Sequence, residues 1–425
     1  MSGGRVVVVG AGVLGCAIGA ALAQDGWQVE VVDALGAVGH GSTSASLGIL
    51  RFHASDRQLV ALSVAGARAW RDPRSWLGDV ATDGFLDVRT TGSLVLDLGG
   101  GYTDVVRGLY DELGVPYEYL DADRLARRMS WLDLGRYAGD DGLRDTAVEQ
   151  LPGGLLTPQA CYVVDPAGSV VPIARAVVAR GGSLRLGTPV RAVHRAGGRA
   201  AGVRLADGTL LPADVVVLAL GPHAAGFLAR EHLVDDWGVG IGPVRHEMFR
   251  LPLAGTARGA LCHLADDDLG INLRPEGDDA LYVGIQQPAG TVGDPAGDPE
   301  VGDPQVDRAA FEDAALRVAR RVHGAGVPAR AQGIAGVYDV TDDWLPVYDR
   351  TALDGCYVAV GTSGTQYKTA PTVARAMAAL VAACEAGADH DRLPVRAPVL
   401  DAGELDLGAF SRLRRPVPSA HTING

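Results

Sequence analysis

The chain has 425 residues, of which 47% are hydrophobic and 21% charged, so it is long enough and apolar enough to form two packed domains. The formal net charge of −13 argues against nucleic acid or an anionic membrane surface as the main partner. Five widely spaced cysteines without a CxxC motif indicate neither a disulfide framework nor a zinc site, and free thiols fit a reducing cytoplasm.

The N-terminus, MSGGRVVVVGAG, lacks the charged, apolar and cleavage regions of a signal peptide. No stretch of the chain reaches the ~18 consecutive apolar residues that a membrane span requires. We therefore expect a cytoplasmic protein that does not cross a membrane.

The first 33 residues carry the pattern of a strand, a glycine-rich turn, a helix and a second strand. The β-branched run RVVVV at 5–9 is typical of a strand buried on both faces. GAGVLG at 10–15 opens the helix, and the next strand ends at Asp33. The glycines let the backbone approach a pyrophosphate at the helix N-terminus, and Asp33 accepts hydrogen bonds from an adenosine ribose. The same acid disfavours NADP, because it repels a 2′-phosphate.

Two further glycine-rich stretches extend this prediction. The sequence GHGSTS occupies 39–44, and GTSGTQYK at 361–368 lies between the buried-type strand CYVAV and a helix. The first fifty residues leave NAD and FAD open. Three close backbone approaches from remote segments suit a long, buried FAD better than an exchangeable NAD.

The intervening segments follow a different pattern. Residues 86–96 alternate like a sheet strand, and 240–290 contain several antiparallel strands. The Gly/Pro/Asp stretch at 290–304 lacks the acid spacing of a calcium loop, and we expect no metal site.

These patterns predict an α/β protein with a Rossmann-type FAD-binding domain assembled from separated segments. A second, antiparallel domain is built from the insertions between those segments. The expected division gives 1–85, 150–225 and 335–405 to the FAD-binding domain, 86–149 and 226–334 to the substrate-binding domain, and 406–425 to a C-terminal tail.

In this order, the segments resemble the D-amino-acid-oxidase superfamily of flavoproteins, most closely its sarcosine oxidase and glycine oxidase branch. The resemblance runs through nearly the whole chain and rests on VVVVGAGVLG with VVDA, HGSTSASLGILR, YVVDPAGSVVPIARAVVARGG, ADVVVLALGP, GVYDVTDDWLPVYD and CYVAVGTSGTQYKTAP. It implies that the second domain has an α+β fold on a mixed sheet and binds substrate. It also implies hydride transfer from a carbon that bears an amine to the flavin N5, followed by hydrolysis of the imine. Oxygen or another acceptor then reoxidises the flavin.

The resemblance also implies which residues bind FAD. Ser42, Thr43 and Ser44 lie beside the pyrophosphate and flavin, Val190 contacts the adenine through its backbone, and Gly221 ends the later strand. The predicted FAD-binding residues are Gly10, Gly12, Val13, Leu14, Gly15, Asp33, Ala34, Gly41, Ser42, Thr43, Ser44, Val190, Gly221, Gly361, Gly364, Thr365 and Lys368.

Three residues match the substrate pocket of this branch. Arg51 corresponds to the arginine that binds the substrate carboxylate, and its fork geometry suits two-point contact. Lys368 corresponds to the second positive contact, and it is the one lysine among 38 basic side chains. Tyr338 corresponds to a tyrosine that lines the same pocket.

The sequence departs from the branch at the positions of covalent flavin attachment. Gly336 stands where covalent members carry a cysteine, and Ala45 stands where others carry a flavin-linked histidine. His40 lies five residues before Ala45 and is a weak candidate for a flavin link. We expect non-covalent FAD.

A second departure concerns oxygen. Sarcosine oxidases place a lysine over the flavin in the strand that here reads ALYVGIQQ, and the matching position is Tyr282. Loss of a nearby cation slows oxygen reduction, because the cation stabilises developing superoxide. The enzyme is then a slow oxidase, uses His246 or an arginine instead, or is a dehydrogenase.

The expected function is oxidation of a secondary amine or amino acid that carries a carboxylate, with oxygen as the more favoured acceptor. Two alternatives stay open. One is a dehydrogenase of a 2-hydroxy acid or amino acid that uses another acceptor, and the other is a flavin-binding subunit of a hetero-oligomer. The sequence leaves the amine itself unidentified.

Overall fold

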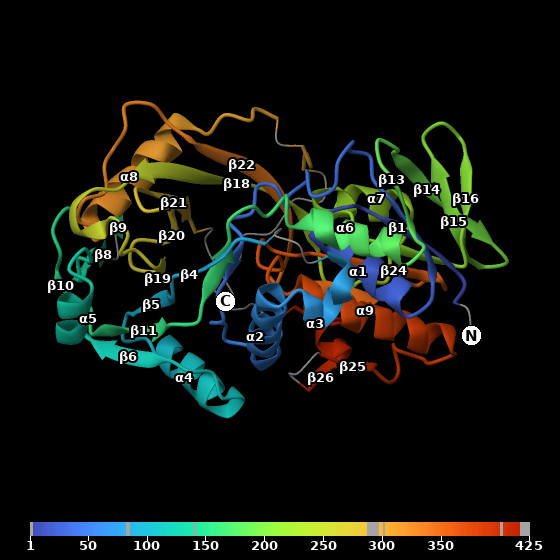
Figure 1. Cartoon of the computed structure of the whole chain (residues 1–425), viewed down its shortest axis with the longest axis horizontal. Coiled ribbons are helices and arrows are strands. Elements are labelled where there is room, and N and C mark those ends of the chain that lie inside the picture. The colour runs from blue at the N-terminus through green and yellow to red at the C-terminus, as the bar shows by residue number, and fades with distance from the viewer. Residues whose placement is uncertain are drawn as a thin grey trace.

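The computed structural model describes residues 3–81, 86–139, 142–286, 297–300, 302–399 and 403–416. The helices and strands gather into two groups that lie side by side along the long axis of the molecule (Figure 1). Each group is built around one large sheet, with the strand orders β13-β2-β1-β17-β24-β23 and β22-β18-β21-β20-β19-β5-β11-β6.

The six-stranded sheet is the Rossmann-type element that the sequence predicts. Its strands are β1 (Arg5–Val9), β2 (Gln28–Val32), β13 (Ser183–Arg185), β17 (Val215–Leu218), β23 (Val347–Arg350) and β24 (Cys356–Val360). All neighbours run parallel except β23, which pairs with β24 in the antiparallel sense. Valines dominate the central strands because both faces of the sheet are covered.

The packing of β1 shows which elements cover each face of the six-stranded sheet. Val6 and Val8 join the core that holds α1 (Val13–Gln24), α6 (Val170–Ala179) and α9 (Ala370–Glu385). Val7 and Val9 point the other way, towards α7 (Ala224–Arg230) and a small three-stranded sheet. That sheet consists of β14 (Val190–Ala196), β15 (Arg199–Leu205) and β16 (Leu210–Pro212).

The eight-stranded sheet forms the second group. Its strands are β5 (Ser93–Asp97), β6 (Glu118–Asp121), β11 (Gly153–Thr157), β18 (Ile241–Pro252), β19 (His263–Asp266), β20 (Ile271–Glu276), β21 (Ala280–Ile285) and β22 (Gly333–Thr341). The sheet is mixed, because β19 and β5 run parallel and the other neighbours run antiparallel. Phe249 and Leu251 bury one face under α8 (Arg308–Arg321), which leaves the opposite face for a binding site.

Two strands lie on the other side of the expected domain division. The strand β11 falls within 150–225 and most of β22 falls within 335–405, segments assigned to the FAD-binding domain, but both strands belong to the eight-stranded sheet. The division of the chain into domains at those boundaries stays a prediction.

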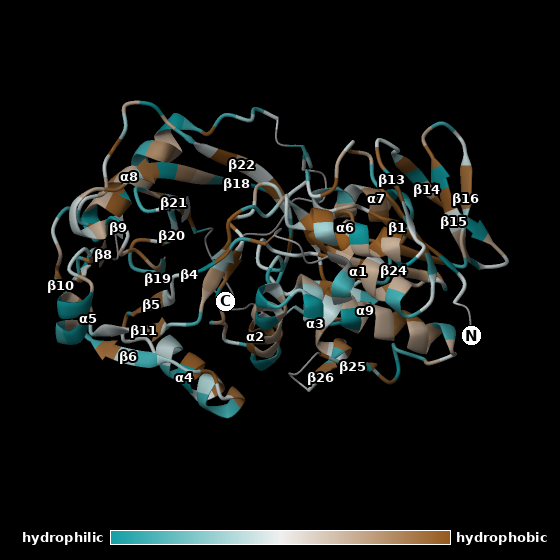
Figure 2. Ribbon diagram, in the orientation of Figure 1, coloured by the Kyte–Doolittle hydropathy of each residue, from teal (hydrophilic) through white to brown (hydrophobic). Residues whose placement is uncertain are grey.

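The remaining elements connect and cover the two sheets. They are the helices α2 (Arg57–Arg71), α3 (Arg74–Leu77), α4 (Tyr102–Leu113) and α5 (Ala122–Arg128) and the short strands β3 (Ile49–Leu50), β4 (Val88–Thr90), β7 (Gly135–Arg136), β8 (Ala138–Gly139), β9 (Gly142–Leu143), β10 (Glu149–Gln150), β12 (Cys161–Val163), β25 (Arg396–Pro398) and β26 (Glu404–Asp406). Four 3-10 turns cover Gly78–Ala81, Gly221–His223, Gly255–Ala257 and Leu407–Phe410. Figure 2 shows hydrophilic patches on α4 and α5, whereas α1 is apolar along its length.

Helix ends follow the capping preferences of their sequences. Asp56, Asp121 and Asp307 each accept a backbone N–H in the first turn of α2, α5 and α8. By contrast, α1 begins at Gly12 without a side-chain cap. The N–H of Val13 is instead accepted by Thr43 Oγ1, from the loop after β2. A helix N-terminus that follows a glycine-rich turn is a typical anion site.

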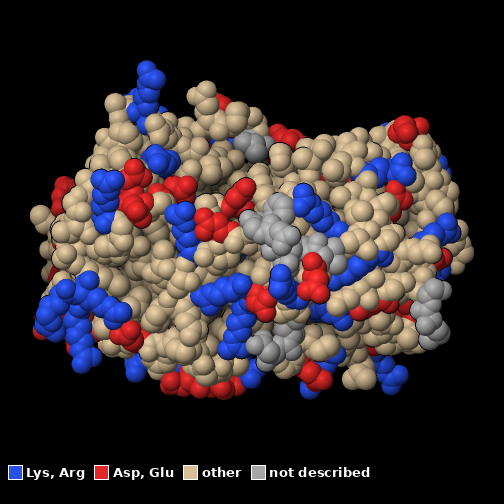
Figure 3. Space-filling model, viewed as in Figure 1, with Lys and Arg blue, Asp and Glu red and all other residues tan. Residues whose placement is uncertain are grey.

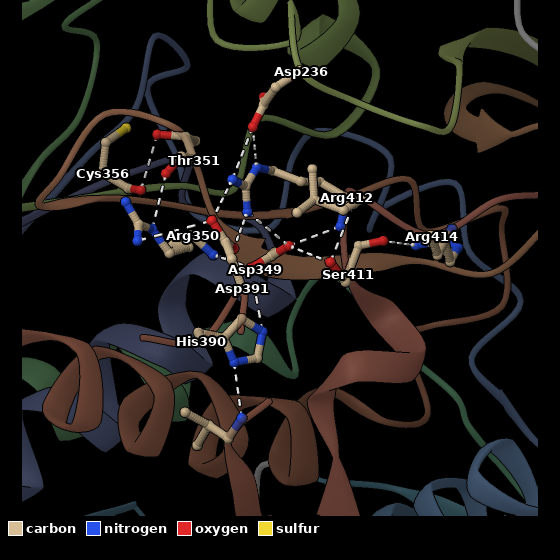
Figure 4. A network of polar contacts seen from close by, with 12 residues as sticks. Asp236, Asp349, Arg350, Thr351, Cys356, His390, Asp391, Ser411, Arg412 and Arg414 are labelled. Carbon is tan, nitrogen blue, oxygen red and sulfur yellow. Dashed lines mark hydrogen bonds and ion pairs between the residues drawn. The ribbon is translucent and has the colours of Figure 1, made fainter. Parts of the chain in front are cut away.

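The C-terminal segment is fixed to the six-stranded sheet by charged groups (Figure 4). Arg412 contacts Asp391 at 2.7 Å, Asp236 at 2.8 Å and Asp349 at 3.3 Å. Asp349 lies on β23, so this network joins the chain end to the edge of the sheet. Residues 417–425 of the expected tail lie outside the described part.

The sequence also led to expectations about the cysteines, the surface charge and membrane-spanning helices. Cys16, Cys161, Cys262, Cys356 and Cys384 are free, as expected. Basic and acidic side chains are interspersed on the face shown in Figure 3. Among the described residues, no helix has the length and apolar character needed to traverse a bilayer.

Candidate active site

A cavity of about 730 Å³ lies where the two sheets meet, and most predicted site residues line it. Both ends of the chain contribute to its wall. Of the predicted cofactor residues, the following line the cavity: Gly10, Gly12, Val13, Leu14, Gly15, Asp33, Ala34, Gly41, Ser42, Thr43, Ser44, Val190, Gly221, Gly364, Thr365 and Lys368. Arg51, His246 and Tyr338 line it as well.

The glycine-rich turn after β1 requires glycine for steric reasons. Gly10 has φ +111°, and a Cβ there would lie 2.1 Å from the Ala219 carbonyl oxygen. A Cβ on Gly15 would lie 1.9 Å from the Gly10 carbonyl oxygen. Because these glycines have no Cβ, α1 can approach β1 and β17 closely, and the start of the helix lines the cavity.

Asp33, at the end of β2, holds this turn in place. Its carboxylate accepts N–H groups from Ala11 at 2.5 Å and from Leu35 at 2.7 Å. Because a carboxylate has about four acceptor sites, Asp33 retains capacity for a ribose hydroxyl. The open helix end, the glycine turn and this acid together fit the adenosine and pyrophosphate parts of FAD.

The loop from His40 to Ser46 forms the next part of the wall. Thr43 Oγ1 accepts the N–H of Val13 at 3.1 Å, and Ser42 donates to the Val337 carbonyl at 2.5 Å. This loop therefore bridges the start of α1 and the strand β22. It brings Ser42, Thr43 and Ser44 to the wall of the cavity, and their contacts with FAD stay a prediction.

The loop that follows β24 is fixed by a buried acid that sequence reasoning missed. Asp339 accepts the N–H of Gly361 at 2.5 Å and the hydroxyl of Thr362 at 2.7 Å, and its carbonyl accepts the N–H of Ser363 at 2.7 Å. Burial raises the pKa of Asp339, and these donors counteract that effect. The acid therefore holds the glycine-rich loop against the eight-stranded sheet.

Arg51 and Lys368 meet in the cavity although they come from opposite ends of the chain. Both side chains are buried, with exposed fractions of 5% and 7%. Arg51 donates to the His53 carbonyl at 2.8 Å. Burial and the charge of Arg51 hold the pKa of Lys368 well below its usual value. The pair therefore places two basic side chains in the wall of one cavity.

Tyr338 and His246 occupy neighbouring strands on the cavity side of the eight-stranded sheet. Their rings meet edge to face with centroids 5.7 Å apart. The Tyr338 hydroxyl is buried without a hydrogen-bond partner in the described part of the chain. Burial lowers the pKa of His246 to about 4, so this ring is neutral at physiological pH.

The two positions of covalent attachment in the family face each other. A Cβ on Gly336 would lie 2.5 Å from the Cβ of Ala45, and both residues line the cavity. Neither residue carries a nucleophile. His40 also lines the cavity, so its role as a weak candidate for a flavin link stays open.

Two predicted residues do not reach the cavity wall. Tyr282 packs with its ring 5.4 Å from the guanidinium of Arg274, which itself pairs with Glu276 at 2.5 Å. Gly361 lies behind the wall, where its N–H meets Asp339. Their assignment to the site stays a prediction that the geometry does not support.

The structure adds a polar chain that sequence reasoning missed. Asn272 lines the cavity and accepts from His263 Nε2 at 2.7 Å, and His263 Nδ1 lies 2.7 Å from the Ser93 hydroxyl. Burial lowers the pKa of His263 to about 3, so one ring nitrogen donates and the other accepts. Asn272 is one of two asparagines in the chain, and that rarity is a signal the sequence offered.

Comparison with known proteins covers most of the chain. The family model described as FAD dependent oxidoreductase matches residues 5–380. A D-amino acid dehydrogenase from Cereibacter sphaeroides is 26% identical over 315 residues, which span 73% of this chain and 62% of that protein. The chain thus covers less than two thirds of that curated relative.

Two solved structures share the fold. The L-proline dehydrogenase from P. horikoshii has a TM-score of 0.74 and 18% identity, with 97% of this chain and 98% of that chain covered. The glycine oxidase from Geobacillus kaustophilus has a TM-score of 0.70 and 21% identity, with 98% and 100% covered. This chain belongs to the family of FAD-dependent oxidoreductases.

Proposed function

We propose that this protein oxidises the C–N bond of an amino acid or secondary amine that carries a carboxylate, with FAD held non-covalently. The observation that carries the proposal is the buried pair of Arg51 and Lys368 in the same cavity as the dinucleotide turn. Two buried basic side chains at one cavity wall favour an anionic ligand, because a positive charge in a dry site is stabilised by a charge of opposite sign. The similar D-amino acid dehydrogenase and glycine oxidase act on ligands of this class.

The residues of the site orient the substrate. FAD supplies the hydride acceptor when it is bound. Arg51 binds the carboxylate in two-point contact and Lys368 adds a second positive contact. Tyr338 and His246 close the wall above the reacting carbon, and both are uncharged, which favours an amine bound in its neutral form. Positioning and exclusion of water account for the contribution of the protein.

The direct test is anaerobic mixing of the FAD-loaded protein with a panel of D- and L-amino acids, N-methylglycine and 2-hydroxy acids. Loss of flavin absorbance with an amine that carries a carboxylate is the expected result. Reduction by lactate but not by alanine would instead identify a 2-hydroxy acid dehydrogenase. If no member of the panel reduces the flavin, the chain acts as a flavin-binding subunit and the proposal is wrong.

Replacement of either cation tests the carboxylate contact. Lys368→Met or Arg51→Met should raise KM at least about 30- to 100-fold and leave FAD bound, because the first removes one charge-assisted hydrogen bond and the second removes two. Steady-state kinetics and flavin absorbance measure both effects. Arg124→Met, at an exposed position on α5, is the control and should leave KM unchanged. Unchanged KM in Lys368→Met would contradict the carboxylate assignment.

The acceptor has two candidates. We favour oxygen, which gives hydrogen peroxide, but Tyr282 matches the position of the oxygen-activating lysine and the chain has no second lysine. That observation supports a dehydrogenase with another acceptor. Comparison of peroxide yield in air with dye reduction under nitrogen distinguishes the two, since an oxidase turns over at similar rates in both assays.

A further inference from the structure

The environment of Lys368 is unusual for a charged side chain. The residue is 7% exposed, and within the described ranges neither a hydrogen bond nor an ion pair to its amine is found. Its backbone packs closely against α2, since a Cβ on Gly66 would lie 2.1 Å from the Lys368 carbonyl oxygen. Burial of a charged ammonium group without an acid partner is unfavourable, because the group loses its hydration.

The titratable groups around Lys368 do not supply that partner. Arg51, His53 and His263 interact electrostatically with Lys368, and Tyr338 and His246 line the same cavity. Burial lowers the pKa of Lys368, and the positive charge of Arg51 lowers it further. None of these five groups carries a carboxylate.

The acids of the region are engaged elsewhere. Asp339 holds the loop after β24, and Asp33 holds the glycine-rich turn at the other end of the cavity. Asp267 acts electrostatically on Arg51, but it is exposed and accepts from Gln286 at 3.0 Å. Glu300, which also lines the cavity, lies 3.8 Å from His223. No acid of the described residues is thus paired with Lys368, and a bound ligand can supply the compensating charge.

We propose that Lys368 is neutral in the site without substrate and takes the ammonium proton from the amino acid that binds there. An N–H bond of the substrate ammonium breaks, an N–H bond forms on Nζ of Lys368, and the electron pair stays on the substrate nitrogen. Nothing is oxidised or reduced in this step. The inference rests on the proposed function and assigns Lys368 a second role, as the base that activates the amine.

The proton transfer gives both the substrate amine and Lys368 the charge that the site requires. The substrate amine becomes neutral, the form that can lose hydride from the neighbouring carbon. Lys368 becomes the cation that its carboxylate contact requires. Because the incoming amino acid is a zwitterion, the net charge of the buried site does not change.

A carboxylate without an amine brings no proton, so it provides the test. Methoxyacetate should bind to the FAD-loaded protein with uptake of about one proton from solvent at pH 8. Its dissociation constant should then rise about tenfold per pH unit above the pKa of Lys368. Isothermal titration calorimetry in buffers of different ionisation enthalpy measures the uptake, and flavin absorbance measures the affinity from pH 6 to 9.

Three variants locate the proton. Lys368→Arg keeps a permanent cation and should bind methoxyacetate without proton uptake and with an affinity independent of pH. Lys368→Met should also show no uptake. His53→Phe should retain the uptake of the wild-type protein, because His53 is buried without a partner for either ring nitrogen and lies beside the same cations.

The inference is overturned if the wild-type protein binds methoxyacetate with no proton uptake and no pH dependence. It is also overturned if uptake persists in Lys368→Arg or disappears in His53→Phe. These outcomes do not depend on turnover. Flavin reduction by amino acids with no proton uptake by methoxyacetate would leave the proposed function intact and remove only this role.

Discussion

The Tyr338 hydroxyl is a buried donor that no described residue satisfies. In the protein without FAD and substrate, such a group is destabilising, since it loses its hydrogen bonds to water. Tyr338→Phe should therefore melt at an equal or higher temperature than the wild-type protein in the FAD-free form. Anaerobic flavin reduction should slow in the same variant if the hydroxyl contacts a bound ligand. A lower melting temperature of the FAD-free variant would show that the hydroxyl has a structural partner.

His246 makes stability depend on pH in a defined window. Burial lowers its pKa in the folded protein to about 4 from 6.5, so between these values the unfolded chain binds the proton first. The free energy of unfolding should fall as the pH falls from about 6.5 to 4, by on the order of 3 kcal/mol from this residue.

Substitution isolates that contribution. Urea denaturation of His246→Gln between pH 4 and 7 should show a weaker pH dependence than the wild-type protein. The control is His232→Asn, because His232 is exposed, and Asn tolerates its positive φ of 53°. Equal slopes for wild type and His246→Gln would mean that His246 is not buried in neutral form.

At the scale of elements, the loop from Gly361 to Thr365 depends on an acid from another sheet. Asp339→Asn replaces one acceptor oxygen by an amide donor opposite Gly361 or Thr362. Loss of one such bond should weaken FAD binding about tenfold without abolishing the fold. Fluorescence titration of the FAD-free protein with FAD measures this. Asp207→Asn, in the exposed β15–β16 turn, is the matched control, and equal affinities for both variants would contradict the role of Asp339.

The sequence predicted the elements around this loop better than the sheet pairing. The run RVVVV, the glycine turn and Asp33 are close in sequence, so their spacing defines a strand, a turn and a helix without knowledge of the rest. The strand β11 was harder to assign, because its pairing with β5 and β6 depends on segments far from it in the chain.

At the scale of the whole molecule, Arg412 connects the C-terminal segment to the six-stranded sheet (Figure 4). Arg412→Met leaves Asp349 buried without its main cation and should reduce the free energy of unfolding by about 3 kcal/mol. The midpoint of urea denaturation reports the loss. Arg308→Met removes an exposed pair with Glu312 and should cost less than about 1 kcal/mol. Similar midpoints for the two variants would show that the network does not hold the chain end.

The sequence by itself determined the cofactor class, the Rossmann-type start and the candidate pair Arg51 and Lys368. Local spacing carried the first two inferences, and the resemblance to the sarcosine oxidase branch, with one compositional rarity, carried the pair. Only the tertiary structure showed that the pair shares one buried cavity, that no described acid is paired with Lys368, and that Asp339 and Asn272 reach the same wall while Tyr282 does not. Burial and charge compensation decide those points, and both are set by contacts between segments that lie far apart in the chain.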